Sequence, residues 1–462
     1  MIAREETSTG GSDSPSEGGQ FDVVIVGGGF SGCYLLHKLR THGFKAVIIE
    51  AAPGLGGVWQ WNNYPGARVD TRVPLYEFSI PEVWKTWNWT ERFPTAAELR
   101  SYFEHVDKVL DLSKDVVYNT KVTNADFDDC QNMWIVKTEH GTQYTAPWFI
   151  PAVGIAATRH FPNWPGLEQF RGQIYHSSFW PRDGVDTQGK RVGVVGTGAT
   201  GVQLVQEISK SAKELIVFQR TPNMALPLQN EQLSPEKQGK DKLQYPKIHM
   251  DRLDSKAGLD FNAYDIATFD HTPEEREAFF EKLWTGGGFR LWSGAYKDGL
   301  TDLRANREVY DFWARKIRAM INDPVKRDIL APIEPPHPFG TKRPSLFKNY
   351  YEAFNQQNVK LIDINTNPVT RVTEDGVVTK DGNHIQLDVL ALATGYDAIN
   401  GSYKSIEIRG RGGNLLSKKW EKGTRTSFGL MTAGFPNMFF VYGPQAPTAF
   451  CNGPTCVELQ GD

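Results

Sequence analysis

Two glycine-rich turns are the residues whose types and spacing most directly imply chemistry. The first has the pattern GxGxxG, with Gly27, Gly29 and Gly32 between an apolar run at 21–26 and an amphipathic stretch. Glycines here allow a tight turn, the approach of backbone N–H groups to a pyrophosphate, and close packing of a helix on a strand. Glu50 ends the next apolar run, near the spacing of about 20 residues expected of an acid that binds a ribose diol. The pattern predicts a dinucleotide-binding unit.

The second glycine-rich turn repeats this arrangement, but the strand after it ends differently. Its residues are Gly196, Thr197, Gly198, Ala199, Thr200 and Gly201. The following apolar run ends in Gln219, Arg220 and Thr221 instead of an acid. An acid would repel a 2′-phosphate, whereas an arginine forms charge-assisted hydrogen bonds with it. The second unit is therefore expected to bind NADPH, with Arg220 at the 2′-phosphate.

A third motif lies just before the second turn and narrows the class of protein. Residues 170–181 read FxGxxxHxxxWP, and the defined positions are Phe170, Gly172, His176, Trp180 and Pro181. Farther upstream, Gly57-Val58-Trp59, Tyr64-Pro65-Gly66 and Asp70 form another pattern. Together these motifs resemble the type I flavin-dependent Baeyer–Villiger monooxygenases, from about residue 21 to the C-terminus. The sequence looks most like the fungal members that act in secondary metabolism.

The resemblance implies FAD on the first unit and NADPH on the second. In this chemistry NADPH reduces FAD, the reduced flavin reacts with O₂, and the resulting peroxide anion attacks a ketone to give an ester or a lactone. A fixed cation must stand beside the peroxide, and arginine suits this role because it does not give up its proton. The family's KRP-type motif matches Lys342-Arg343-Pro344, so Arg343 is the expected catalytic cation. Asp70 is expected to pair with it, because a buried aspartate without a cationic partner would protonate.

The resemblance also implies individual cofactor contacts. The FAD site would include Gly57, Val58, Trp59, Asp70, Tyr76 and Val122. The NADP site would include Arg68, Gln203, Thr221 and the second turn. Arg68 is close enough to Asp70 in sequence to help hold the oxidised nicotinamide.

His176 invites two interpretations. A histidine in a cofactor enzyme can act as a general base. However, this one lies on a segment with Gly172 and Pro181, as a connection between two domains would, and in the family this segment behaves as a hinge. We favour the hinge.

The elements that must position these residues read as an α/β fold with two Rossmann-like domains and a helical insertion. We expect an FAD domain over 21–155 and 385–462, a fingerprint linker over 156–181, and an NADP domain over 182–223 and 332–384. Residues 224–331 form the insertion, because charged residues dominate there and a capping box at Thr272-Pro273-Glu274-Glu275 opens a helix. Residues 1–20 read as a disordered tail.

Bulk properties exclude several other classes. The 462 residues carry a net charge of −3, so no global field recruits nucleic acid or an anionic membrane. The sequence has no secretory signal and no apolar run long enough to cross a bilayer, so we expect a soluble cytoplasmic protein. Its four cysteines are scattered, which indicates neither a disulfide framework nor a metal site and favours a reducing compartment. Disulfide reductases are excluded, since only Cys33 lies near the first turn.

Two rival functions stay open, as does the oligomeric state. Flavin enzymes that oxidise nitrogen or sulfur use a protonated peroxide and need no Arg343. A non-catalytic FAD- or NADP-binding remnant is the other rival, because a helix expected to begin near Pro454-Thr455 is soon followed by the end of the sequence at Asp462, which suggests a truncated product. A ketone and O₂ are the expected partners, and the ketone itself is not readable from the residues.

Overall fold

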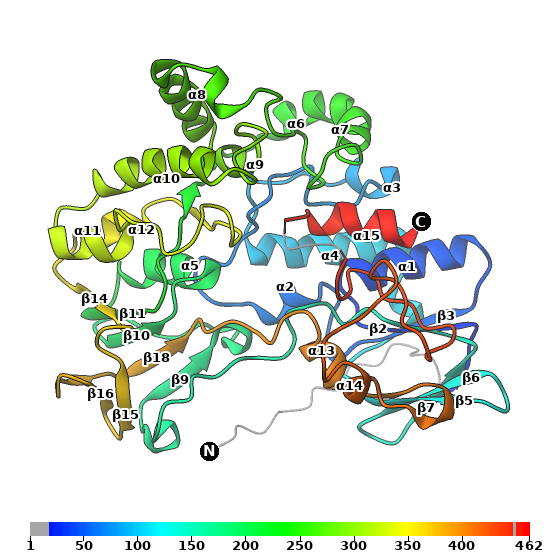
Figure 1. Ribbon diagram of the computed structural model, residues 1–462. Coiled ribbons are helices and arrows are strands. Elements are labelled where there is room, and N and C mark those ends of the chain that lie inside the picture. Colours follow the sequence, from blue (N-terminus) through cyan, green and yellow to red (C-terminus); the bar gives the residue numbers. More distant parts are fainter. Residues whose placement is uncertain (1–17, 447–449) are drawn as a thin grey trace.

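The computed structural model describes residues 18–446 and 450–462, in which two parallel sheets lie side by side below a layer of helices (Figure 1). Most of the tail expected at 1–20 lies outside these residues. Its last two residues contradict the expectation, since Gly19–Gln20 form strand β1, which pairs with β7. Open backbone groups at a sheet edge accept such a short strand whatever its side chains.

The first parallel sheet is built around the first glycine-rich turn. Its order is β4-β3-β2-β8, and all neighbours are parallel. The strands are β2 (Val23–Val26), β3 (Ala46–Ile49), β4 (Val116–Val117) and β8 (Trp148–Pro151). Helix α1 (Phe30–Thr41) connects β2 to β3, which gives the predicted βαβ unit. Every residue of β2 and β3 is buried, as continuous apolar runs in a sheet covered on both faces require.

A second, mixed sheet within the first domain was not predicted. Its order is β1-β7-β6-β5-β19, with β5, β6 and β7 antiparallel to one another. The strands are β5 (Val122–Asp128), β6 (Met133–Thr138), β7 (Gln143–Ala146) and β19 (Glu407–Arg409). Three short helices contact this sheet: η6 (Arg411–Gly413), α13 (Gly401–Lys404) and α14 (Leu416–Lys419). A fourth, η1 (Ser113–Asp115), precedes β4 and contacts β3 of the first parallel sheet.

The other parallel sheet surrounds the second turn and corrects two predicted boundaries. Its order is β14-β11-β10-β18-β9, all parallel. The strands are β9 (Gln173–His176), β10 (Arg191–Val195), β11 (Glu214–Gln219), β14 (Val359–Asp363) and β18 (Val389–Leu392). Because β18 pairs with β10, it belongs to this unit and not to the FAD domain expected from residue 385. The fingerprint segment is likewise not a free linker, since β9 is the edge strand.

Several smaller elements complete this unit. Helix α5 (Ala199–Ile208) follows β10, η2 (Leu167–Gln169) and η3 (Ser177–Phe179) flank β9, and α12 (Tyr350–Ala353) precedes β14. An antiparallel meander consists of β15 (Val369–Thr373), β16 (Gly376–Thr379) and β17 (His384–Gln386).

Residues 224–331 are mainly helical and lie above both sheets in Figure 1. The helices are α6 (Pro235–Asp241), η4 (Lys242–Gln244), α7 (Tyr245–Asp251), η5 (Thr268–Asp270), α8 (Pro273–Gly286), α9 (Arg290–Ser293), α10 (Leu303–Arg318) and α11 (Pro324–Leu330). Helix α8 begins at the predicted capping box, in which Thr272 and Glu275 exchange hydrogen bonds. A short parallel pair, β12 (Leu226–Pro227) and β13 (Leu346–Phe347), joins the insertion to the segment after Arg343.

Three helices of the first domain face this layer: α2 (Val58–Trp61), α3 (Pro81–Trp84) and α4 (Ala96–Leu110). The predicted C-terminal helix is α15 (Gly453–Gly461), which packs against α1. No helix among the described residues has the length and apolar character needed to cross a bilayer.

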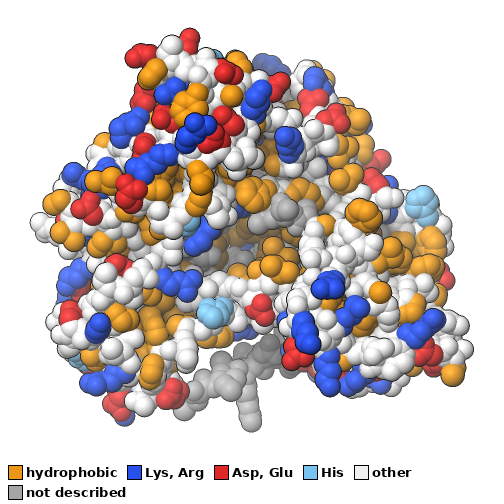
Figure 2. All heavy atoms as spheres, viewed as in Figure 1, with side chains coloured by type: hydrophobic (Ala, Val, Ile, Leu, Met, Phe, Trp, Pro, Cys, Tyr) orange, Lys and Arg blue, Asp and Glu red, His pale blue; other side chains and the backbone are white. Residues whose placement is uncertain are grey.

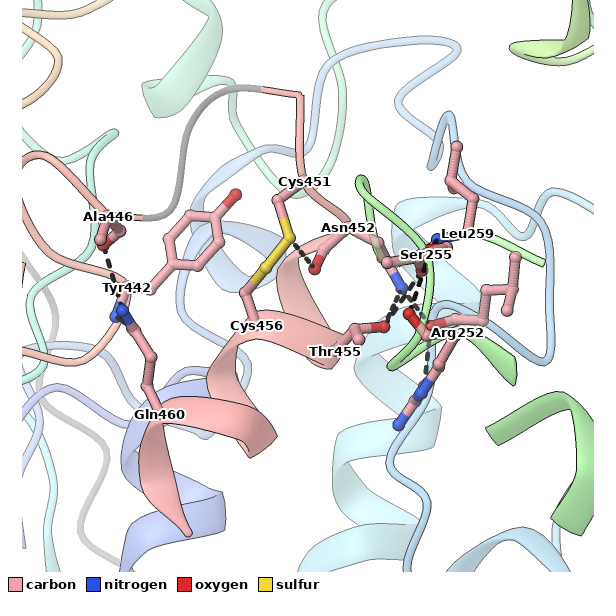
Figure 3. Close-up of a disulfide and its surroundings, with 12 residues drawn as sticks. Arg252, Ser255, Leu259, Tyr442, Ala446, Cys451, Asn452, Thr455, Cys456 and Gln460 are labelled. Carbon is pink, nitrogen blue, oxygen red and sulfur yellow. Dashed lines mark hydrogen bonds between the residues drawn. A yellow bond between two sulfur atoms is a disulfide. The ribbon is translucent and has the colours of Figure 1, made fainter. Parts of the chain in front are cut away.

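A disulfide between Cys451 and Cys456 corrects the expectation of scattered, unpaired cysteines (Figure 3). The first turn of α15 brings their Cα atoms to 6.8 Å, within the range that a disulfide spans. Cys33 and Cys130 are free, so the described residues contain one disulfide and two free thiols.

Candidate active site

Arg343 and Asp70 are 273 positions apart in the chain and form a bidentate ion pair. The Nε group of Arg343 donates to one carboxylate oxygen at 2.9 Å, and Nη2 donates to the other at 2.8 Å. Two parallel charge-assisted bonds fix the plane of the guanidinium as well as its position. The pairing expected from the sequence is therefore present.

Three further contacts hold Arg343. Nη2 donates to Thr71 Oγ1 and Nη1 donates to the backbone carbonyl of Cys451, both at 3.3 Å. The guanidinium carbon lies 4.6 Å from the ring centre of Phe289. Burial lowers the pKa of Arg343, but Asp70 raises it by more, so the pKa lies above its ordinary value. The site thus holds a permanent, oriented positive charge.

Two phenols stand close to this ion pair. Burial raises the pKa of Tyr76, and the negative charge of Asp70 adds to the rise. Burial also raises the pKa of Tyr442, against the opposing effect of Arg343. Both side chains remain neutral hydroxyl groups at neutral pH, able to donate and accept hydrogen bonds.

Helix α5 of the second unit holds the loop that carries Asp70. Gln203 Nε2 donates to the backbone carbonyl of Arg68 at 3.1 Å, and Gln203 Oε1 accepts from the Tyr64 hydroxyl at 2.7 Å. A Cβ added at Gly66, where φ is +81°, would lie 2.9 Å from the carbonyl oxygen of Gln203. Only glycine lets the loop approach the helix this closely.

The same helix holds the segment after Arg343. Gln206 Oε1 accepts from the backbone N–H groups of Lys348 at 2.6 Å and Asn349 at 2.9 Å. Since both glutamines lie on α5, one helix positions the two halves of the ion pair. That helix begins at the turn expected to bind the NADPH pyrophosphate.

The first glycine-rich turn has the shape that a dinucleotide requires. A Cβ at Gly32 would lie 1.9 Å from the carbonyl oxygen of Gly27, so α1 can pack here only with glycine. Gly29 faces the backbone of Gly57, with 3.5 Å between its added Cβ and the Gly57 Cα. The indole N–H of Trp59 is buried and has no hydrogen-bond partner among the described residues. A backbone cradle at a helix N-terminus with an unpaired donor beside it fits FAD.

Glu50 stands at the carboxyl end of β3, facing this turn. Its side chain is buried and accepts from the backbone N–H groups of Ala52, at 2.7 Å, and Gly28. Burial raises its pKa despite these bonds. A cleft lined in part by Gly54 and Tyr118 opens next to the same strand end, where the adenosine half of FAD is expected.

The second turn shares this packing but is more open. A Cβ at Gly201 would lie 2.1 Å from the carbonyl oxygen of Gly196, whereas one at Gly198 would meet no atom within 4 Å. Thr197 Oγ1 donates to the Thr221 carbonyl at 2.8 Å, which ties the turn to the end of the next strand. The open backbone at Gly198 fits a pyrophosphate.

Arg220 is exposed and takes part in no ion pair in the described ranges 18–446 and 450–462. This leaves its guanidinium accessible to a phosphate. Ala199 begins α5 next to it, and Thr200 Oγ1 donates to the Tyr64 hydroxyl at 3.4 Å. The residues present thus fit the phosphates of NADPH.

Two expected cofactor contacts have other partners. The Arg68 guanidinium forms an ion pair with Glu91 at 3.1 Å and donates to the Phe93 carbonyl. Gln203 is engaged with the Asp70 loop, as described above. Val122 is buried in the core of the mixed sheet, and Val58 lies at the start of α2. Contacts of these four residues with a cofactor stay predictions.

His176 is buried at the end of β9, where two connections between the units meet. Its Nδ1 lies 2.9 Å from Ser178 Oγ and its Nε2 lies 3.2 Å from the Gly395 carbonyl. The backbone N–H of His160, on the other connection, also donates to Gly395. Burial lowers the pKa of His176, so the ring is neutral. A neutral ring with both nitrogens in local contacts favours the hinge interpretation.

The other fingerprint positions serve packing. Phe170 and Trp180 are buried, and Trp180 packs on Tyr175 with 5.5 Å between ring centres. A Cβ at Gly172 would lie 2.5 Å from the Phe170 ring. Pro181 directly follows Trp180, where β9 and η3 have ended.

Several site residues were missed from the sequence, namely Thr71, Gln206, Phe289, Tyr442 and the carbonyl of Cys451. A signal existed for Gln206, because Gln203 and Gln206 are two polar residues three apart in the otherwise apolar stretch 201–206 of this helix. No signal existed for the Cys451 carbonyl, since residue type does not reveal a backbone contact.

Comparison with known proteins places this site in a family. The family described as flavin-binding monooxygenase-like matches residues 20–232. The chain is 46% identical to cyclopentanone 1,2-monooxygenase of Comamonas sp. over 443 residues, which cover 96% of this chain and 80% of that protein. It is 45% identical to the FAD-binding monooxygenase acrE of Aspergillus aculeatus, over 96% of this chain and 74% of that protein. The crystal structure of OTEMO in complex with FAD and NADP matches with a TM-score of 0.93 and 37% identity, over 97% of this chain and 84% of that one. The chain belongs to the flavin-dependent Baeyer–Villiger monooxygenases, the family that its fingerprint resembles.

Proposed function

We propose that this FAD- and NADPH-dependent monooxygenase inserts one oxygen atom of O₂ next to the carbonyl of a ketone, with Arg343 and Asp70 at the reacting atoms. The observation that carries the proposal is the partly buried, bidentate Arg343–Asp70 pair between the two dinucleotide units. An enzyme that oxidises nitrogen or sulfur has no need of such a fixed cation.

The roles of the two residues follow from their geometry. When bound, FAD and NADPH would together supply the electrons that activate O₂, and O₂ would supply the oxygen atom that reaches the substrate. Arg343 places its positive charge where negative charge develops on the carbonyl oxygen, and its raised pKa prevents it from giving a proton to the attacking oxygen. Asp70 orients the guanidinium through its two hydrogen bonds.

We also propose that the fingerprint segment links NADPH binding to the arrangement of the two units. His176 holds the Gly395 connection, and Gln203 holds the Asp70 loop. Movement of either contact when NADPH binds or leaves would change the position of Asp70 relative to Arg343.

The cytoplasm is the proposed compartment, and fungal secondary metabolism is the proposed setting. Cys33 and Cys130 are free thiols, and Cys130 is exposed. An exposed free thiol supports a reducing compartment, whereas the Cys451–Cys456 disulfide is the opposing observation. The similarity to the acrE monooxygenase supports the setting.

The test is product analysis under ¹⁸O₂. The purified protein receives FAD, NADPH and a panel of polycyclic and linear ketones, with a sulfide and a tertiary amine as competing substrates, and a reaction without NADPH is the blank. We expect esters or lactones that carry one ¹⁸O atom. Sulfoxide or N-oxide as the only product would favour the rival oxygenases. A colourless protein that consumes no NADPH would favour the non-catalytic remnant.

A further inference from the structure

A cleft opens beside the Arg343–Asp70 pair on the side of the helical insertion. Asp70 and Phe289, which both contact Arg343, also line this cleft. The rest of its wall comes from the loop after Asp70, from residues 259–261 and from residues 287–290. Figure 2 shows that the face of the molecule turned toward the viewer is hollowed in its middle, with basic and apolar side chains around the hollow. A ketone reaching Arg343 through this cleft would pass those residues.

The charges around the cleft do not balance. Three arginines and two carboxylates line it. Asp70 is paired with Arg343, and one carboxylate oxygen of Asp260 is paired with Arg72. The other oxygen of Asp260 is buried without a hydrogen-bond partner among the described residues. In the same part of the chain, no ion pair joins Arg92 or Arg290 to a carboxylate.

Each of these two arginines makes only weak side-chain contacts. Arg92 donates one long hydrogen bond, 3.5 Å, to the Gln229 carbonyl and lies over the Phe93 ring, with 5.5 Å to the ring centre. Glu231, whose backbone carbonyl accepts from the Arg92 N–H, has its carboxylate paired with Lys237 at 3.0 Å. The guanidinium of Arg290 lies over the Phe261 ring, with 5.1 Å to the ring centre.

The two guanidinium groups also act on each other. Burial lowers the pKa of Arg92, and the charges of Arg72 and Arg290 lower it further, against the opposing charges of Glu231 and Asp260. Partly buried like charges repel each other, and an anion bound between them would relieve that repulsion. Between these arginines and Asp70 the wall is apolar, with Leu75, Phe93 and Leu259.

We propose that Arg92 and Arg290 form a carboxylate subsite, so that the substrates of this enzyme are ketones that carry a carboxylate. This inference rests on the function proposed above. The carboxylate binds the two guanidinium groups, the hydrocarbon part lies along the apolar wall, and the carbonyl reaches Arg343. The subsite thereby fixes which end of the ketone faces the oxidant.

The experiment compares 3-(2-oxocyclohexyl)propanoate with its neutral amide. We expect the wild type to prefer the acid in kcat/KM, and the preference to fall by about 10–100-fold in Arg290→Gln and in Arg92→Gln, since a charge-assisted hydrogen bond contributes about 1.5–3 kcal/mol. The values for the amide should change little. Arg371→Gln, an exposed residue on β15, is the matched control and should keep the preference. Equal rates for acid and amide in the wild type, or an unchanged preference in both variants, would overturn the proposal.

A second measurement tests binding at the subsite independently of the reaction. The Kd of each compound is determined from its effect on the flavin spectrum of the oxidised holoenzyme, which needs no turnover. If neither compound is oxygenated, the proposed function fails, while tighter binding of the acid that depends on Arg92 and Arg290 still supports the subsite. Equal Kd values for acid and amide would overturn it.

Discussion

The two dinucleotide units share one packing solution and differ at the strand end. In both, the last glycine of the motif lies against the carbonyl of the first, and an added Cβ would lie 1.9 Å away at Gly32 and 2.1 Å away at Gly201. The acid that ends β3, Glu50, is buried and bonded to its own turn, whereas Arg220 at the end of β11 is exposed. Glycine positions thus specify a dinucleotide, and the strand end specifies which one.

The helices that follow the two turns also differ in what they hold. Helix α1 of the first unit packs against α15, whose Glu458 accepts from Ser79 and pairs with the buried Arg252 of the insertion. Helix α5 of the second unit instead holds the two segments that carry Asp70 and Arg343. Under the proposed function, binding of NADPH at the start of α5 would therefore be felt at the ion pair.

Both turns pack a glycine against a backbone carbonyl, and this shared feature predicts the largest effects of mutation. Gly32→Ala should give a protein that holds no FAD, because its Cβ would overlap a backbone carbonyl that cannot move. Gly201→Ala should keep FAD but lose NADPH-driven flavin reduction. Flavin absorbance and anaerobic stopped-flow reduction measure the two outcomes. Gly239→Ala on α6, where a Cβ would meet no atom within 4 Å, is the matched control. Full FAD content in Gly32→Ala would contradict the comparison.

The different strand ends predict the next largest effect. Arg220→Gln should lower the preference for NADPH over NADH by about 10–100-fold, because charge-assisted bonds to the 2′-phosphate contribute about 1.5–3 kcal/mol. FAD content should not change. Rates of flavin reduction with each nucleotide give the ratio, and an unchanged ratio would mean that Arg220 is only a solvated surface charge.

The hydrogen bonds from helix α5 to the segments that carry Asp70 and Arg343 predict a smaller change in activity. Gln203→Leu and Gln206→Leu should each reduce the share of NADPH that yields oxygenated product by about 3–10-fold, the loss expected from one or two neutral hydrogen bonds. Flavin reduction itself should persist. Hydrogen peroxide release is measured against product, with Gln188→Leu, an exposed position, as the control. If coupling stayed complete in both variants, α5 would have no positioning role.

The buried acids predict the smallest effect, a pH dependence of stability that belongs to the first unit. Among the described residues, the buried acids are Glu50, Glu77 and Glu458. Burial raises the pKa of Glu77 to about 8. Because the folded-state pKa is raised, its stabilising effect is complete below about pH 4.5 and is lost as the pH rises through 8. We expect the melting temperature to fall by a few degrees between pH 6 and 8, and Glu77→Gln to remove most of that fall. A fall of the same size in the variant would assign it to other groups.

The sequence allowed the βαβ units to be predicted because their signals are local. An apolar run, a glycine turn and an amphipathic stretch follow one another along the chain, as β2, the first turn and α1 do. The sheet to which β18 belongs could not be predicted in this way. Its run of buried residues suits either parallel sheet, and only the path of the chain in space places it beside β10.

The candidate site was predictable only in part. Arg343 and Asp70 were identified through motifs and not through spacing, since no local rule connects residues so far apart. Contacts made through backbone carbonyls, such as those of Cys451 and Arg68, leave no trace in residue type. The disulfide was missed because a spacing of five residues allows a bridge only once the turn between the cysteines is known.

The most direct test of the central claim is Arg343→Ala, studied with the FAD-loaded enzyme. Asp70, which would be left without its partner, belongs to the expected FAD site, so FAD content is checked first. Anaerobic reduction by NADPH should stay within about threefold of the wild type, while ester formation should fall by about 10²–10³-fold or more, the loss typical of a removed charge-stabilising donor. Arg343→Lys should recover little, because a lysine cannot form the two-pronged bond to Asp70. Ester formation by Arg343→Ala at the wild-type rate would contradict the account.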